Sequence, residues 1–252
     1  MQRPKSAMPA RWMVWLAMLA ALSTSPRGYT QSSPEAQLAD AAALLQAFTV
    51  DDDTAIPADL LQRARGIAVI PGVFRGGFIF GARRGRGVVA VRDERGQWSN
   101  PAFLTLTGGS VGWQFGAEST DIVLVFANDN AVKNMGSGKF TLGGDATAVA
   151  GPLGRRATAA VTFRAEVYGY MRSRGLFAGA AFEGTRLDID EETNARFYGS
   201  NGSAHPLGAR NAATPASAQR FLATLTQVAA ARPLPQQTTG TDAQEAVTFP
   251  LE

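Results

Sequence analysis

The chain of 252 residues contains no cysteine and a single histidine, His205. Without cysteine there are no structural disulfides, no thiolate zinc sites and no cysteine nucleophiles. The lipid-modified cysteine that tethers bacterial lipoproteins is excluded as well, so we expect no anchor of that kind. The sequence also shows no convincing metal-ligand pattern, and we expect neither a metal nor a cofactor.

Acidic residues are absent before residue 31, where the basic residues are Arg3, Lys5, Arg11 and Arg27. The apolar stretch 12–22 is too short to span a bilayer comfortably and has the length of the hydrophobic region of a secretory signal peptide. We therefore expect residues 1–30 to be a signal peptide and linker, and the mature protein to be periplasmic or secreted. The alternative is an uncleaved N-terminal anchor.

The formal charge of +3 depends on this leader, because the remaining chain has 20 basic residues against 21 acidic ones. A nucleic-acid partner requires a basic domain, so we expect none. The uneven placement of charge along the chain is more informative than its sum.

Glycine recurs every few residues from Gly66 to Gly116, which excludes long helices there. Short apolar segments of strand composition lie between the glycines. We expect a hairpin across Ala82–Arg86, because Gly81, Gly85 and Gly87 can adopt positive φ there. Further strands are predicted at 103–107, 121–127, 157–163, 165–172, 176–182 and 184–190.

Apolar residues at helical spacing predict helices on both sides of this strand-rich region. They are expected at 34–48, 56–65, 128–134, 191–198 and 216–231. The fold class is therefore α+β, mainly antiparallel β-sheet, open or barrel-like, with N-terminal helices. One domain is expected over residues 35–200, followed at 201–252 by an extension that is partly helical and then disordered.

One catalytic pattern is present, the G-x-S-x-G of Gly108–Gly112 with Ser110 at its centre. A nucleophile elbow requires a strand before the serine and a helix after it. Residues 113–117 instead alternate like another strand, and His205 lies in a polar stretch. A serine hydrolase using Ser110 and His205 is therefore kept only as an alternative function.

Two binding patterns are incomplete. Residues 136–140 resemble the end of a phosphate loop, but Lys133 and Phe140 replace the required glycine and serine or threonine. Residues 188–194 resemble a calcium loop, but Thr193 stands where glycine is needed. A solvated acidic helix start explains the second segment more simply.

Arginine is concentrated in two parts of the chain, residues 63–95 and 155–174, and few acidic residues lie within either part. Arginine binds phosphate through a planar fork of donors, and glycine-rich backbone can approach the same anion. The alternative is that the arginines pair with the acidic residues at 51–53 and 183–192. The predicted anion- or lipid-binding residues are Arg75, Arg83, Arg84, Arg86, Arg155 and Arg156.

The order of several segments resembles the SYLF-domain family, a lipid-binding family related to yeast actin assembly, and within it the exported bacterial members. The resemblance covers roughly residues 35–200 and is carried by Ile56–Pro71, Gly77–Phe78, Gly85–Val88, Gly96–Pro101, Gly109–Gly116, Ala150–Arg155, Tyr168–Tyr170, Ser173–Gly179 and Asn194–Gly199.

This resemblance implies a non-enzymatic lipid-binding module. Eukaryotic members bind phosphoinositides and some engage actin, through basic residues and an amphipathic N-terminal helix. On this chain those features correspond to Arg75, Arg84, Arg86 and the helix at 34–48. That helix departs from the pattern, because no Lys or Arg occurs between Thr30 and Gln62.

Membrane affinity must therefore come from the arginines of the β-domain, each contributing about 1 kcal/mol near an anionic surface. The leading hypothesis is an exported module that binds anionic phospholipid headgroups or envelope surfaces. Its expected partners are an anionic membrane surface and an envelope protein. Besides the hydrolase, the alternative is a protein-binding structural factor of the envelope.

Overall fold

The computed structural model describes residues 32–50, 54–77, 80–111, 118–136, 139–154, 165–173, 175–180, 182–199, 207 and 214–230. The chain divides into two compact units, Met1–Ser33 and Pro34–Glu252, and the second contains every element below. The predicted signal peptide, the strand expected at 157–163 and the final tail lie outside the described residues.

In the described residues, the sheet is preceded by α2 (Pro34–Val50) and α3 (Ala58–Arg63). Pro34 and Glu35 suit the first turn of α2, where a backbone donor has no partner and negative charge is favoured. Its buried residues recur at helical spacing and include Leu38, Ala41, Leu45 and Phe48. The helix predicted at 34–48 is thus confirmed, but its buried side consists mainly of leucines and Phe48, whereas Ala36, Ala39 and Ala43 are exposed.

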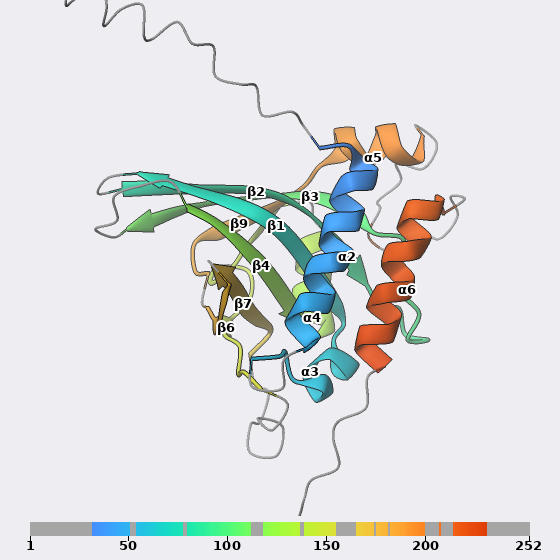
Figure 1. The fold of residues 1–252 in the computed structure, drawn as a ribbon, viewed down its shortest axis with the longest axis horizontal. Helices are drawn as coiled ribbons and strands as arrows, with labels where there is room; N and C mark the ends of the chain where they lie inside the picture. The colour runs from blue at the N-terminus through green and yellow to red at the C-terminus, as the bar shows by residue number, and fades with distance from the viewer. Residues whose placement is uncertain are drawn as a thin grey trace, which may run out of the picture. The chain divides into compact units, whose positions relative to one another are not determined.

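In the described residues, nine strands form one sheet in the order β5-β9-β3-β2-β1-β4-β7-β6, with β8 paired to β7. Every pairing is antiparallel except that of β6 with β7. The sheet curls into a half-barrel, which confirms the predicted fold class (Figure 1). The strands are β1 (Gly66–Gly77), β2 (Phe80–Val91), β3 (Ala102–Val111), β4 (Glu118–Phe126), β5 (Lys139–Thr141), β6 (Ala148–Ala150), β7 (Val167–Ser173), β8 (Leu176–Gly179) and β9 (Thr185–Ile189).

Three further helices are α4 (Asp129–Gly136), α5 (Glu191–Tyr198) and α6 (Ala216–Ala230), close to their predicted positions. Helices α2 and α6 lie side by side and run in the same direction (Figure 1). The core therefore extends past residue 200, because Phe221 and Leu225 of α6 are fully buried in it.

The sheet separates two apolar cores, because successive strand residues point to opposite faces. Ile67, Val69 and Val88 pack with α2, α3 and α6 on what we call the α2 face. Ala68 and Val89 pack with α4 on the α4 face. This alternation fixes the face on which each arginine of β2 must lie.

A β-bulge bends β1, where the pairing with β2 shifts between Val69 and Phe74. Gly72 at the bulge has φ of +60°, a conformation that favours glycine, and its N–H donates to Asp121 Oδ1 at 2.9 Å. Bulges of this kind increase local twist and redirect a strand. The residues after the bulge consequently form a bent extension of the sheet.

The hairpin predicted across Ala82–Arg86 is wrong, because β2 runs through that segment without interruption. The strands β1 and β2 are joined nearer Gly77 instead. Gly87 lies in the strand, and a Cβ there would stand 2.3 Å from the Val69 carbonyl oxygen. The glycine serves close approach to the bulge and not a turn.

Candidate anion-binding surface

The candidate site is the extension of β1 and β2 beyond the bulge, residues 73–77 and 80–85, which we call the β-arm. Figure 1 shows β1 and β2 continuing past α2 to form it. Its cross-strand pairs include Phe74 with Arg84 and Arg75 with Arg83. Three of the predicted site residues thus belong to the arm, and Arg86 follows it directly.

The β-arm presents its arginines on both faces. Arg83 shares the α4 face with Val89, since both are odd-numbered residues of an uninterrupted strand. Arg84 and Arg86 share the α2 face with Val88. The structure therefore does not gather all the predicted arginines on one side of the sheet.

Arg83 has a cationic and aromatic environment. Its Cζ lies 5.6 Å from the centre of the Phe182 ring, and the side chain is half-buried. Burial lowers the pKa of the Arg83 guanidinium, and the positive charge of Arg75 lowers it further. On its other side Arg75 is paired in register with Glu118 of β4. Within the described ranges, Arg83 has no carboxylate partner.

The α2 face of the arm carries a polar row across the sheet. Arg84 is exposed and pairs with Thr107 of β3, which pairs in turn with Arg186 of β9. Arg186 forms an ion pair with Asp188, in which Arg186 Nε and Asp188 Oδ1 are 2.7 Å apart. Arg84 itself makes no ion pair in the part of the chain that the structure describes.

Other arginines have structural partners. Arg172 of β7 pairs with Asp121 of β4 at 2.6 Å, and both side chains are partly buried. Arg65 pairs with Asp129 at 3.2 Å. Cζ of Arg92 lies 4.4 Å from the centre of the Trp98 ring. Burial lowers the pKa of the Arg92 guanidinium, and the positive charge of Arg65 lowers it further. Pairing therefore explains part of the arginine excess, and these two pairs use Asp121 and Asp129, which lie outside the acidic segments 51–53 and 183–192. Arg155 and Arg156 lie outside the described residues.

The described residues do not provide the structural setting that the catalytic alternative requires. Ser110 lies inside β3, paired with Gly81, and the strand continues to Val111. A nucleophile elbow requires the serine at a turn from strand to helix. His205 lies outside the described residues. The segment at 136–140 follows α4 and enters β5, whereas a phosphate loop precedes a helix.

The acidic segment 188–194 caps a helix. Asp190 accepts the backbone N–H of Thr193 at 3.0 Å, which confirms the predicted acidic helix start. The described residues contain no group of three histidine, aspartate or glutamate side chains that could hold a metal ion. In that same part of the chain, no helix has both the length and the apolar character needed to cross a bilayer.

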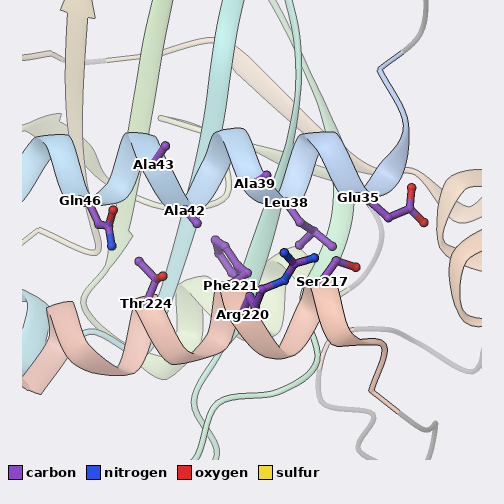
Figure 2. A pocket seen from close by; sticks show the side chains of 10 residues that line it. All are labelled: Glu35, Leu38, Ala39, Ala42, Ala43, Gln46, Ser217, Arg220, Phe221 and Thr224. Carbon is purple, nitrogen blue, oxygen red and sulfur yellow. The ribbon is translucent and has the colours of Figure 1, made fainter.

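A groove of about 260 Å³ lies between α2 and α6. Figure 2 shows Phe221 and Arg220 of α6 extending toward α2, whose alanines leave space between the helices. Glu35 lies at one end of the groove. Sequence reasoning did not find this groove, since it depends on how α6 returns to the N-terminal helix.

Residues 107–228 match the protein-family model described as "Ysc84: Las17-binding protein actin regulator". The match begins in β3 and ends in α6, so the β-arm precedes it.

The chain is 41% identical over 154 residues to LAS seventeen-binding protein 3 of Saccharomyces cerevisiae, covering 59% of this chain and 33% of that protein. It is 40% identical over 167 residues to SH3 domain-containing YSC84-like protein 1 of Xenopus laevis, covering 63% and 50%. For the Homo sapiens protein of the same name, identity is 38% over 175 residues, covering 66% and 51%. The chain thus spans a third of the yeast protein and about half of the vertebrate proteins. The name of the yeast protein describes binding to LAS seventeen, and the name of the vertebrate proteins describes an SH3 domain.

Proposed function

Because this chain belongs to the Ysc84, or SYLF-domain, family, we propose that it is a non-enzymatic module that binds anionic phospholipid surfaces through the β-arm. The contacts are assigned to Arg75, Arg83, Arg84 and the adjoining Arg86. We propose that the protein acts after export, in the periplasm or outside the cell, since residues 1–30 have the composition of a signal peptide.

The observation that carries this proposal is the direct opposition of Arg75 and Arg83 across two strands. Like charges at such positions destabilise a sheet. Arg83 has no carboxylate partner among the described residues, so a phosphate group beside it would offset the positive charge of Arg75 and accept hydrogen bonds from the Arg83 guanidinium. Exposed Arg84 adds a third positive charge on the other face of the arm.

These charges are sufficient for measurable membrane affinity. Three arginines near an anionic surface contribute about 3 kcal/mol together, which is roughly a hundredfold in partitioning. The attraction is screened by salt, because the Debye length falls from about 10 Å at 0.1 M to about 3 Å at 1 M. Their distribution over both faces suits an arm that enters the headgroup layer end-on, where phosphates surround it.

The test is co-sedimentation of the mature chain with vesicles of phosphatidylcholine, with and without phosphatidylglycerol. Binding is expected only to the anionic vesicles. The double variant R83Q/R84Q is expected to bind at least tenfold more weakly. The matched control R65Q/R220Q removes the same charge away from the arm and is expected to change binding less than twofold. Equal binding to both vesicles, or equal loss in both variants, would contradict the proposal.

The groove between α2 and α6 favours a second function, the binding of a protein partner. Its apolar lining beside Arg220 is suited to a helix more than to a phosphate. An A42R variant would fill this groove while leaving the β-arm intact. Loss of partner binding in that variant, with vesicle binding unchanged, would assign the two functions to separate surfaces.

A further inference from the structure

Large apolar side chains are rarely exposed in the described part of this chain. Three of them have more than a third of their area exposed: Val50 at 73%, Phe74 at 41% and Leu176 at 77%. Of these three, only Phe74 lies on the β-arm. It is paired with Arg84 of β2 on one side and with Ser119 of β4 on the other. An aromatic ring thus stands among the arginines proposed to bind lipid.

We infer that Phe74 enters the interfacial layer of an anionic bilayer when the β-arm binds, and that Arg75, Arg83 and Arg84 then lie at the depth of the phosphates. This inference rests on the proposed function and adds the ligand's physical state. The ligand is an assembled bilayer and not a soluble phosphate, because a soluble anion would leave Phe74 in water.

The composition of the arm agrees with insertion. The seven residues that join Arg75 to Arg83 along the chain carry no charge. Charged groups there would have to be desolvated in a bilayer at high cost, whereas arginine side chains extend to the headgroups. Arg75 and Arg83, which are paired directly after Phe74 and Arg84, are therefore the last charged residues of β1 and β2 before the strands are joined.

Phe74 and the arginines should differ in their response to salt. Ionic attraction is screened within a few ångströms at high salt, but the transfer of apolar area out of water is not weakened. Given its exposed area, the ring is expected to contribute roughly tenfold to partitioning. The loss in F74S should thus be similar at low and high salt, whereas the loss in R84Q should shrink.

The first experiment compares F74S with V50S and L176S on vesicles of phosphatidylcholine and phosphatidylglycerol. The control residues are more exposed than Phe74 and lie off the arm. F74S is expected to bind roughly tenfold more weakly, and each control within twofold of the wild type. Equal losses in all three variants would overturn the inference. Melting temperatures show whether each variant is folded.

The second experiment uses the absence of cysteine, which makes single labelling sites unambiguous. An environment-sensitive NBD group on F74C is expected to shift to shorter wavelength on anionic vesicles. Nitroxides near the start of the acyl chains should quench it. The same group on V50C should not respond, and inorganic phosphate should shift neither.

The outcomes separate the two claims. If the labelled chain sediments with vesicles while the NBD group at position 74 remains in water, insertion is refuted and surface binding stands. If the wild-type chain fails to bind anionic vesicles, both the proposed function and this inference are refuted. A shift at position 74 caused by phosphate alone would also overturn the assignment to a bilayer.

Discussion

Gly87 is the position where one added methyl group most directly tests the packing at the base of the β-arm. In G87A the new Cβ would lie 2.3 Å from the Val69 carbonyl oxygen and 2.8 Å from Ile70 Cα. Both atoms belong to the backbone of β1, so rotation of a side chain cannot relieve the contact. The bulge and the strand pairing around it must shift instead.

The cost follows from this overlap. Overpacking of a well-packed core costs about 1–3 kcal/mol, and a contact with rigid backbone belongs at the upper end. We expect G87A to lose about 3 kcal/mol, which lowers the melting temperature by about 6–12 °C for a domain of this size. Urea unfolding followed by circular dichroism measures the change.

Gly109 provides the matched control. It lies in neighbouring β3, and a Cβ there would have no atom within 4 Å. G109A should therefore change stability by less than about 1 kcal/mol, with a slight gain from restricting the unfolded chain. If both variants lose the same free energy, or if G87A is neutral, the explanation of these glycines by close packing is refuted.

Two further predictions concern buried polar groups. Asn194 is 3% exposed and exchanges two hydrogen bonds with the Phe103 backbone, so N194A should lose about 2–3 kcal/mol in urea unfolding, and a neutral result would contradict this. Burial raises the pKa of Tyr170 and of Tyr198 above 10.0, with a lesser contribution from Tyr168 to Tyr170. The unfolded tyrosines ionise first, so stability should be full below about pH 10 and fall above it, more weakly in Y170F; melting temperatures from about pH 8 to 11 measure this.

Much of the fold could be predicted because local patterns determine it. The spacing of Leu38, Ala41, Leu45 and Phe48 is visible in the sequence. The helix predicted from it ends at residue 48, two residues before the observed end of α2. The hairpin position could not be predicted in this way. Glycine permits both a turn and close packing, and only the bulge in β1 shows that Gly87 serves the second purpose.

The candidate site could be predicted only in part. Arginine density pointed to the β-arm, but the partners of the other arginines are distant in sequence, as Asp121 is from Arg172 by 51 positions. The two faces of the arm follow from the uninterrupted pairing of β2 with β3. The exposure of Phe74 depends on the bend after Gly72, which no local pattern reveals.

Amide hydrogen exchange of the protein, with and without anionic vesicles, most directly tests whether the β-arm is the binding surface. Slower exchange is expected in peptides spanning residues 73–84, with α6 unchanged. Protection confined to α2 and α6, with the arm exchanging as in solution, would contradict the account and assign binding to the groove.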